Sequence, residues 1–298
     1  MQNNYRSGFV AIVGRPNAGK STLLNNMVGQ KIAIVSDKPQ TTRNRIQGVM
    51  SEPRGQVVFL DTPGVHKPKH RLGEYMADIT RSSLQGVDVI LYMVDVTAKF
   101  GSGEEFVLNL LAKIDTPVVL LLNKVDLVAK ESLFPLLAEW NQRGKFAAII
   151  PASALTGDNS ESIKAEIFKL LPEGPQYYPE DAVTDHPEQF IIAEFIREKV
   201  LLKTRDEIPH SVAINVEEVV DKPELVSIRA VIYVERDSQR GIIIGKGGSM
   251  LKEIGAEARR DMEQLLGSKV YLELWVKVKK DWRNRDDMLR NLGYDSRE

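Results

Sequence analysis

The chain contains no cysteine among its 298 residues, which excludes disulfides, thiolate catalysis and cysteine-based zinc sites. Its four histidines lack the spacing of metal ligands. Net charge is almost absent as well: at −1, the chain as a whole has no attraction for nucleic acid, so any basic surface must be local. The first residues lack the apolar core of a signal peptide, and no apolar run is long enough to cross a bilayer, so we expect a cytoplasmic protein.

The motif with the most specific chemistry is Gly-Arg-Pro-Asn-Ala-Gly-Lys-Ser at residues 14–21. An apolar run at 9–13 precedes it and predicts a buried strand, while the apolar spacing of 22–28 predicts a helix that ends at Gly29. A strand, then G-x-x-x-x-G-K-S, then a helix is the context of a phosphate-binding loop. This context favours that interpretation over a glycine-rich turn that binds nothing.

The residue types in this loop have distinct physical roles. Gly14 and Gly19 let backbone N–H groups point at a phosphate, beside the positive end of the helix. Lys20 adds a full charge over the β- and γ-phosphates, and the Ser21 hydroxyl can ligate Mg²⁺. The predicted nucleotide contacts of the loop are Gly14, Arg15, Pro16, Asn17, Ala18, Gly19, Lys20, Ser21 and Thr22.

Two further polar segments can complete a magnesium–nucleotide site. The loop at 36–43 carries Thr42, whose hydroxyl can reach the metal when a γ-phosphate is present; the alternative is an ordinary surface loop. A predicted strand at 56–60 leads into Asp61, which can hold Mg²⁺ through water, and Gly64, which can offer a backbone N–H to the γ-phosphate. The same Asp-Thr-Pro-Gly could instead form only a turn. The predicted metal ligands are Ser21, Thr42 and Asp61, and the predicted nucleotide contacts of this segment are Asp61, Thr62, Pro63 and Gly64.

A third motif predicts selectivity for guanine. The apolar run at 117–122 ends in Asn-Lys-Val-Asp at 123–126. The carboxylate of Asp126 can accept hydrogen bonds from both N1–H and the exocyclic amine of guanine, a pair that adenine does not offer, so the site should reject ATP. A later strand at 147–150 delivers residues 151–154, whose backbone can reach the base carbonyl. The predicted base contacts are Asn123, Lys124, Asp126, Ser153, Ala154 and Leu155.

Motifs at the ends of strands indicate a doubly wound α/β sheet, because ligands of such sheets bind outside the carboxyl ends of the strands. An apolar run at 87–94 adds a central strand, and 158–171 reads as a closing helix. Prolines then accumulate over 172–187, which predicts a stiff linker. We expect a nucleotide-binding domain at 1–175, a linker at 176–187 and a second domain at 188–298.

The second domain places a glycine loop within an α+β pattern. The predicted order is a helix at 189–203, strands at 212–220 and 226–236, the glycine-rich stretch 240–248, a helix at 250–266 and a strand at 269–278. Residues 245–248 have G-x-x-G spacing, with a lysine inside the loop and isoleucines before it. KH domains clamp the backbone of single-stranded RNA with such a loop; a bare glycine-rich turn is the alternative.

Basic and aromatic residues gather around this loop and near the end of the domain. We expect Trp275 to pack in the core, because it falls within an alternating strand, and Trp282 to stack on bases, because it follows that strand. The isoleucines at 243 and 244 should flank the bases, and Lys246 should pair with phosphate. The predicted RNA contacts are Ile243, Ile244, Gly245, Lys246, Gly247, Gly248, Lys252, Lys277, Lys279, Lys280, Trp282 and Arg283.

The motifs of the first domain resemble, in order, the five G motifs of a GTPase, at 14–21, 41–42, 61–64, 123–126 and 153–154. The resemblance implies a Ras-like P-loop NTPase that binds GTP or GDP with Mg²⁺ and hydrolyses GTP. Val65 stands where Ras-like enzymes carry a water-orienting glutamine, so catalysis must be completed otherwise. In related potassium-stimulated GTPases, the asparagine that matches Asn17 helps to hold a K⁺ ion. Catalytic roles are therefore expected for Asn17, Lys20, Thr42, Asp61 and Gly64.

One GTPase domain followed by a KH-type (type II) domain resembles the Era family over essentially the whole chain. The likeness includes Ile-Arg-Glu-Lys at 196–199, Ser-Val at 211–212, Ile-Gly-x-x-Gly at 244–248 and Leu-Glu-Leu-Trp-Val-Lys-Val-Lys at 272–279. It implies binding to the 3′ end of small-subunit ribosomal RNA and to the pre-ribosomal particle. It also implies some peripheral association with the inner face of the cell membrane. We further expect a monomer.

Two other functions stay open at this stage. The protein could be an RNA-binding module in which GTP is a slowly hydrolysed ligand that sets the conformation, a reading that Val65 favours. It could also be a membrane-associated signalling GTPase without RNA, against which the glycine loop and the basic second domain argue. The intact Lys20, Ser21 and Asp61 favour a GTP-hydrolysing switch that controls RNA binding.

Overall fold

The computed structural model describes residues 5–65 and 70–294 of the chain. The chain folds as two compact units. The first comprises Met1–Ala33, Thr42–Lys67 and Met76–Asp185, and the second comprises Ile34–Thr41, Pro68–Tyr75 and His186–Glu298. Two short segments of the predicted nucleotide-binding domain therefore belong to the second unit.

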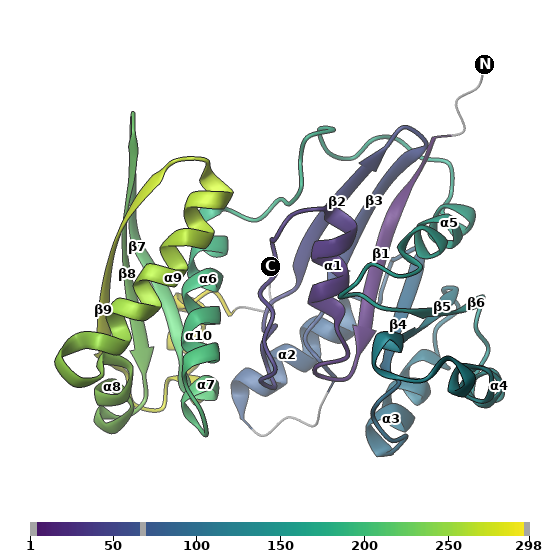
Figure 1. Cartoon of the computed structure of the whole chain (residues 1–298), viewed down its shortest axis with the longest axis horizontal. Helices are drawn as coiled ribbons and strands as arrows, with labels where there is room; N and C mark the ends of the chain where they lie inside the picture. Colours follow the sequence, from purple (N-terminus) through teal and green to yellow (C-terminus); the bar gives the residue numbers. More distant parts are fainter. Residues whose placement is uncertain (1–4, 66–69, 295–298) are drawn as a thin grey trace. The chain divides into compact units, whose positions relative to one another are not determined.

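The first unit is built on a six-stranded sheet with the strand order β2-β3-β1-β4-β5-β6 (Figure 1). β2 is antiparallel to β3, and the other neighbours are parallel. The strands are β1 (Arg6–Gly14), β2 (Ile46–Glu52), β3 (Gly55–Asp61), β4 (Val89–Asp95), β5 (Val118–Asn123) and β6 (Ala148–Ala152). This sheet confirms the predicted doubly wound α/β fold. The pattern of the sequence does not indicate β2, because Gly48 and polar residues interrupt its apolar positions.

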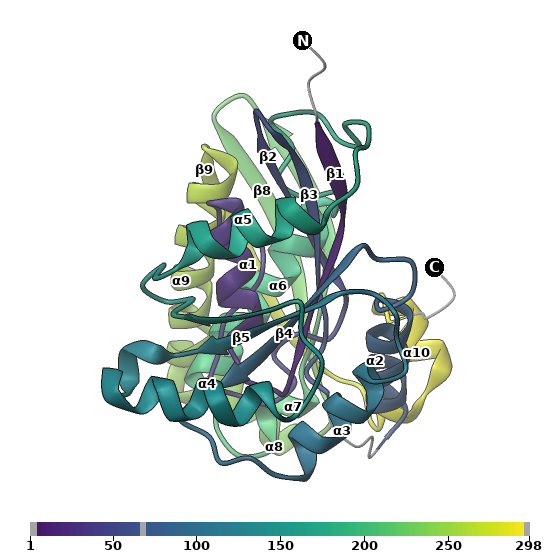
Figure 2. The same cartoon turned by 90° about the vertical axis from the view of Figure 1, so that its right-hand side faces the viewer.

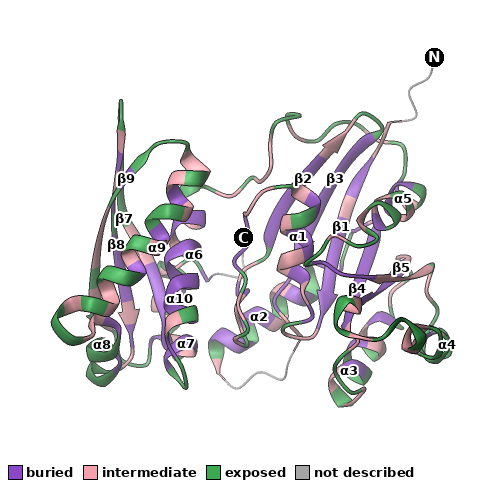
Figure 3. Cartoon of the chain, in the orientation of Figure 1, coloured by how far each residue is buried: buried purple, intermediate pink, exposed green. Residues whose placement is uncertain are grey.

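Helices cover both faces of this sheet. Figure 2 shows α1 and α5 on one face and α3 on the other. The helices are α1 (Lys20–Val28), α2 (Arg71–Ser82), α3 (Ser102–Leu111), α4 (Leu133–Asn141) and α5 (Ser160–Leu170), with short 3₁₀ turns η1 (Val125–Leu127) and η2 (Lys130–Ser132). Because helices bury both faces, β4 and β5 are continuous apolar runs rather than alternating ones (Figure 3). In the ranges 5–65 and 70–294, no helix has the length and apolar character needed to span a membrane.

Register brings the strand-end motifs to one edge of the sheet. Asp61 pairs with Ile12, and Asn123 pairs with Asp95 on one side and Ala152 on the other. Asp61, Asp95, Asn123 and Ala152 are each the last residue of their strand, and ligands of doubly wound sheets bind at this edge.

The segment predicted as a linker is bonded to the first unit by its own backbone. The N–H groups of Tyr177 and Tyr178 both donate to Gln56 Oε1, and Gln56 Nε2 donates to the Tyr178 carbonyl at 2.9 Å. Thr184 Oγ1 donates to the Gln47 carbonyl at 2.7 Å. Gln56 is fully buried in β3 and needs these partners, so the first unit continues to Asp185 instead of ending near 175.

The second unit has a three-stranded sheet with the order β7-β8-β9, in which β7 is antiparallel and β9 parallel to β8. Its elements are α6 (Glu188–Lys203), α7 (Ile208–Ser211), β7 (Ala213–Lys222), β8 (Leu225–Val234), α8 (Asp237–Ile244), η3 (Lys246–Gly248), α9 (Ser249–Leu266), β9 (Lys269–Val278), η4 (Trp282–Asn284) and α10 (Asp286–Asn291). This order of helices and strands confirms the predicted α+β KH-type fold.

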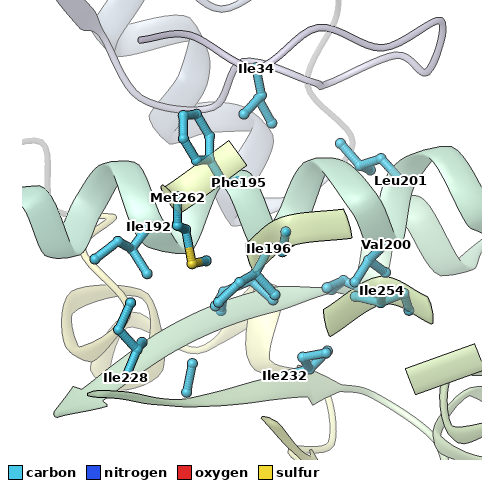
Figure 4. Packing of buried hydrophobic residues seen from close by; sticks show 14 of the residues in the cluster. Ile34, Ile192, Phe195, Ile196, Val200, Leu201, Ile228, Ile232, Ile254 and Met262 are labelled. Atoms are coloured by element: carbon cyan, nitrogen blue, oxygen red, sulfur yellow. The ribbon is translucent and has the colours of Figure 1, made fainter. Parts of the chain in front are cut away.

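The core of the second unit lies between its sheet and helix α6. Ile192, Ile196 and Val200 of α6 pack with Ile228 and Ile232 of β8, as Figure 4 shows. Residues of α9 join the same cluster from the same side of the sheet. Alternate residues of β9 also face this core, which leaves its other residues on the opposite side of the sheet.

The expectations for two tryptophans are wrong. Trp282 is 0% exposed: its indole N–H donates to the Ser211 carbonyl at 2.8 Å, and its ring stacks on Tyr294. Trp275 is 55% exposed. In β9, Trp275 lies on the same face as Glu273 and Lys277, because alternate residues of a strand point to the same side. This alternation with charged residues is visible in the sequence and indicates an exposed position. Trp282 therefore cannot stack on RNA bases, whereas Trp275 is accessible.

These positions predict a large difference in stability. Trp282→Ala removes a buried ring and orphans the Ser211 carbonyl, so unfolding of the second unit should become easier by about 3–5 kcal/mol. Trp275→Ala serves as the control and should change stability by less than about 0.5 kcal/mol, as surface substitutions do. Urea unfolding followed by far-UV circular dichroism measures both. Equal losses for the two variants would contradict this assignment of the core.

Candidate functional site

The phosphate-binding loop wraps closely around its neighbours. A Cβ on Gly14, whose φ is 155°, would lie 2.3 Å from the Met93 carbonyl oxygen. A Cβ on Gly19, whose φ is 102°, would lie 2.3 Å from Asn123 Nδ2. Asn17 between them is also left-handed, with φ at 64°. A larger residue would collide with the Met93 backbone at Gly14 and with the Asn123 side chain at Gly19, and both positions have a positive φ, which explains the glycine spacing of the motif.

Helix α1 begins at the residue that this loop delivers. No side chain caps the helix at Gly19, so the N–H groups of its first turn stay available for an anion. Lys20 Nζ reaches back along the loop and donates to the Gly14 carbonyl at 3.3 Å and the Arg15 carbonyl at 3.1 Å. The ammonium thus lies over the loop, where a phosphate bound by the backbone would contact it.

Lys20 and Asp61 form a buried pair of opposite charges. Burial lowers the pKa of Lys20, and the negative charges of Asp61 and Glu104 offset part of that effect. Burial raises the pKa of Asp61 to about 6, against the opposing influence of Lys20 and of hydrogen bonds from Ser21 and Thr42. Both shifts arise because charges are taken out of water. Phosphates and a cation would supply the missing counter-charges, so the site has the electrostatics of one built for a ligand.

Three oxygen donors meet at this point. Ser21 Oγ donates to Asp61 Oδ2 at 2.7 Å and lies 2.9 Å from Thr42 Oγ1. Asp61 Oδ1 is buried and has no hydrogen-bond partner among the described residues. Mg²⁺ prefers such hard oxygens and takes its other ligands from phosphates and water. The structure therefore brings together the predicted metal ligands Ser21, Thr42 and Asp61, and they fit Mg²⁺. In the described part of the chain, no group of three histidine or acidic side chains offers another metal site.

The segment after Asp61 presses against the phosphate-binding loop. Thr62 Oγ1 donates to the Ile12 carbonyl at 2.9 Å, and a Cβ on Gly64 would lie 2.7 Å from the Pro16 Cα. The N–H of Val65 donates to the Gly14 carbonyl at 3.2 Å, and its side chain packs on the apolar core of the unit. Val65 has no polar group to orient water, so hydrolysis depends on another group.

A single amide ties the phosphate-binding loop to the base-binding loop. Asn123 Nδ2 donates to the Ala18 carbonyl at 2.7 Å, and Asn123 Oδ1 accepts from the Ala154 N–H at 2.8 Å. Asn123 is buried, and these bonds join three segments that are distant in sequence. In this structure the side chain of Asn123, a predicted base contact, holds two loops together.

The neighbouring residues shape the base-binding edge. Lys124 is left-handed, with φ at 69°, and its ammonium pairs with Asp95 Oδ2 at 2.5 Å. The turn that follows presents Asp126, which is exposed and has no hydrogen bond to another described residue. Leu155 is exposed on the adjacent loop. Asp95 was not among the predicted site residues, although its position at the end of β4 is a signal that could have identified it.

The sequence also gave no indication of a buried carboxylate that holds Arg15. Glu104 in α3 is buried, accepts a hydrogen bond from the Tyr92 hydroxyl and lies 3.6 Å from Arg15 Nη1. Burial and the adjacent carboxylate raise the pKa of Tyr92. A Cβ on Gly103 would lie 2.8 Å from Arg15 Nε, so the guanidinium rests along the start of α3.

The predicted RNA loop is an exposed turn between two helices. Gly245 ends α8 and Gly248 precedes α9, and together with Gly247 they have φ values of 72°, 81° and 60°. This backbone explains the glycine spacing, since few other residues adopt it readily. Lys246 projects from the turn and is exposed, and α9 begins directly after it, with free N–H groups in its first turn.

The expectation that Ile243 flanks bases is wrong. Ile243 is 0% exposed and belongs to the core of the second unit, whereas Ile242 is exposed and Ile244 is half-buried. These residues lie in α8, where successive side chains are about 100° apart, so a run of three isoleucines cannot share one face. Only Ile242 and Ile244 are accessible beside the loop.

The predicted basic contacts fall into two groups. Lys246, Lys252 and Lys280 are exposed and make no ion pair with another described residue. Lys277 pairs with Glu217, Arg283 is held by Glu235 in two bonds, and Lys279 lies 5.8 Å from the Tyr233 ring centre. Among the predicted basic contacts, the lysines without an ion pair to another described residue therefore lie at the glycine loop and the start of α9, and at 279–280 after β9.

The tie made by Asn123 is testable. Asn123→Ala orphans two buried backbone groups, each at a cost of about 1–3 kcal/mol, so GTP affinity should fall roughly tenfold or more. Titration with a fluorescent GTP analogue measures this loss. Asn141→Ala, an exposed asparagine at the end of α4, is the matched control and should bind normally. Normal affinity in Asn123→Ala would show that the tie does not shape the site.

Comparison with known proteins gives two family matches. Residues 9–124 match the model of the 50S ribosome-binding GTPase family, and residues 207–283 match the KH domain. The first model covers the phosphate-binding loop, and the second covers the glycine loop.

The chain also matches whole proteins from end to end. It is 53% identical to the GTPase Era of Staphylococcus haemolyticus over 291 residues, which is 97% of each chain. It is similar to a crystal structure of an Aquifex aeolicus Era variant bound to GDP·AlF₄⁻, at 43% identity and a TM-score of 0.94. It is equally similar to a structure of Era in complex with MgGDPNP and nucleotides 1506–1542 of 16S ribosomal RNA. Each structural match covers 97% of this chain and 99% of the other. With the site geometry and this identity across both units, the chain belongs to the Era family of GTPases.

Proposed function

We propose that this GTPase is a switch that binds the 3′ end of small-subunit ribosomal RNA through its KH domain and acts in assembly of the small ribosomal subunit. The observation that carries the proposal is the exposed glycine loop with Lys246 at its tip, on a chain that also brings Ser21, Thr42 and Asp61 together beside the phosphate-binding loop. The similar Era structure in complex with MgGDPNP and a 16S ribosomal RNA fragment supports it.

The nucleotide site supplies binding and charge stabilisation. Backbone N–H groups of the phosphate-binding loop and Lys20 hold the phosphates, and Ser21, Thr42 and Asp61 would hold Mg²⁺, which neutralises charge on the β- and γ-phosphates. Asp126 selects guanine. When the γ-phosphate is lost, the contacts that hold Thr42 and Gly64 in place are lost with it. The release of these segments is how a GTPase changes conformation on hydrolysis.

The glycine loop holds RNA by its backbone. Lys246 pairs with a phosphate, the first turn of α9 offers N–H groups, and the half-buried Ile244 borders the bases. The GTP form binds RNA more tightly in this proposal. By linkage, RNA must then tighten GTP binding by the same factor.

RNA binding by the loop is tested with an aspartate pair, Lys246→Asp with Gly247→Asp. Repulsion from phosphates should lower affinity for the 3′-terminal RNA about tenfold or more, and the loss of a phosphate contact should reduce the salt dependence of binding by a slope of about 0.7. Lys222→Asp, at the exposed end of β7, is the charge control. Fluorescence anisotropy with GDP and with a GTP analogue measures both variants. Unchanged RNA binding would place the contact elsewhere, and equal affinity with both nucleotides would leave two independent modules.

Hydrolysis needs help that Val65 cannot give, and we propose K⁺ held by Asn17. The rate should be severalfold higher in potassium than in sodium, and this difference should vanish in Asn17→Ala and Asn17→Gly. The glycine variant controls for strain, because Asn17 has a positive φ. Equal rates in both salts for the wild type would favour an arginine supplied in trans, worth about 10³–10⁵ in such enzymes, or the slow-ligand function.

We propose three further properties: binding to the pre-ribosomal particle, a monomeric state, and peripheral association with the inner face of the cell membrane. The family resemblance implies the first and the third. Light scattering after size exclusion tests the second, and flotation with lipid vesicles tests the third. Co-sedimentation with immature small subunits tests the first.

A further inference from the structure

The first turn of helix α3 holds a buried carboxylate that the nucleotide contacts described above do not use. Glu104 is 3% exposed, and Tyr92 of strand β4 is 0% exposed. A buried carboxylate is costly unless it is paired and hydrogen-bonded. Among the described residues, the side chain of Glu104 contacts the Tyr92 hydroxyl and the Arg15 guanidinium, and all three residues belong to the first unit.

Tyr92 holds this carboxylate rigidly. Its ring packs edge-on against the ring of Trp140, with the ring centres 6.0 Å apart and the planes at 73°. Its hydroxyl donates to Glu104 Oε2. Burial and the adjacent carboxylate raise the pKa of Tyr92, so the hydroxyl keeps its proton and remains a donor. One oxygen of Glu104 is therefore fixed by a side chain that is itself enclosed in the core.

The other oxygen of this carboxylate faces the phosphate-binding loop. Arg15 Nη1 lies 3.6 Å from Glu104 Oε1. A Cβ on Gly103 would lie 2.8 Å from Arg15 Nε and 3.0 Å from its Cδ, so the end of the arginine side chain rests directly on the Gly103 backbone. Because Glu104 is buried, water and salt screen this ion pair less than a pair of two exposed side chains. The guanidinium is thus held on the first turn of α3 by charge and by shape.

The backbone of Arg15 belongs to the loop that would wrap a phosphate. Its carbonyl accepts hydrogen bonds from Lys20 Nζ at 3.1 Å and from the Ala18 N–H at 3.4 Å. An arginine whose side chain is tied to α3 has little freedom to turn this carbonyl away from the two donors. Burial lowers the pKa of Lys20, and the charges of Asp61 and Glu104 oppose that effect. Glu104 therefore acts on the loop through its shape and through its charge.

We propose that Glu104 is a positioning residue for the nucleotide site, which holds the Arg15 side chain on α3 and so keeps the phosphate-binding loop in its binding conformation. Gly103 is part of the same device, because it leaves room for the guanidinium beside the carboxylate. The proposal rests on the nucleotide-binding part of the proposed function and is independent of RNA binding by the glycine loop. Loss of the device weakens binding of GTP and of GDP, because the loop contacts the phosphates that both nucleotides share.

A methyl group at Gly103 tests the position of Arg15 without changing any charge. Gly103→Ala would force the guanidinium off the start of α3, so affinity for GDP and for a GTP analogue should fall roughly 3- to 10-fold, the value of one ordinary hydrogen bond. Isothermal titration calorimetry measures this loss. Alanine is the better helix former, so the midpoint of thermal unfolding without nucleotide should not fall.

Gly255→Ala is the matched control for this substitution. Gly255 lies inside helix α9, and its Cβ would meet only Leu274 Cδ1 at 3.4 Å, which is an ordinary contact. The same exchange in a helix that is remote in sequence from the phosphate-binding loop should leave both nucleotide affinities unchanged.

A double-mutant cycle tests whether Glu104 acts through Arg15. Glu104→Gln keeps an oxygen for the Tyr92 hydroxyl but removes the charge that holds the guanidinium. In the wild-type background it should weaken binding of both nucleotides by the same 3- to 10-fold, about the value of one hydrogen bond. In an Arg15→Met background it should cause no further loss, because the ion pair is already absent.

Wild-type affinity for both nucleotides in Gly103→Ala and in Glu104→Gln would overturn the proposal. An equal loss from Glu104→Gln with and without Arg15 would also overturn it, since the charge would then act on Lys20 directly. If Glu104→Gln does not fold, Gly103→Ala still decides, because it leaves every polar group of the device in place. A wild-type chain that binds neither nucleotide would overturn the proposed function together with this proposal.

Discussion

The geometry of the nucleotide site depends on one buried amide. Asn123 holds the carbonyl of Ala18 in the phosphate-binding loop and the N–H of Ala154 in the base-binding loop, and both bonds lie at the end of β5. A phosphate site and a base site are useful only at a fixed separation, because one nucleotide must reach both. The Asn123 side chain sets that separation by bonding to both loops. The bonds are kept because an unpaired carbonyl or N–H group in the interior would be costly.

Around this tie, the site holds buried charged groups whose burial is only partly offset by their neighbours. Lys20 and Asp61 are buried. Burial lowers the pKa of Lys20 and raises that of Asp61, which favours the neutral form of each side chain. Asp61 Oδ1 lacks a partner among the described residues, and the first turn of α1 has no side-chain cap. A magnesium nucleotide brings negative phosphates to the lysine and helix end, and a cation to the carboxylate. Each of these unfavourable features becomes a binding contribution when the nucleotide arrives.

The second unit is more than an appended RNA module. Its core includes Ile34. Two buried charged side chains of α6, Arg197 and Glu198, form hydrogen bonds with the backbone of Ile34–Thr41.

Local patterns were sufficient wherever the chemistry resides in a short stretch of chain. The phosphate loop, Asp61, the Asn-Lys-x-Asp motif and the G-x-x-G loop were all predicted from the sequence, as were most of the strands and helices next to them; helix α8, which leads into the G-x-x-G loop, was not. Each motif combines a local backbone conformation, such as a positive φ at glycine, with a polar group of defined chemistry. Apolar runs identified the parallel strands because both faces of that sheet are buried.

Only the tertiary structure decided which side of an element is covered. The burial of Trp275 and Trp282 is the reverse of what was expected, since α6 and α9 cover one face of the three-stranded sheet while Trp282 packs against Ser211 and Tyr294. Ile243 turns inward because its run is helical rather than extended. The hydrogen bonds of Arg197 and Glu198 with a loop more than 150 positions earlier cannot be recognised from any local pattern in the sequence. The sequence by itself determined what chemistry the chain can perform, while long-range packing decided which residues are accessible to perform it, because burial is set by neighbours that are distant along the chain.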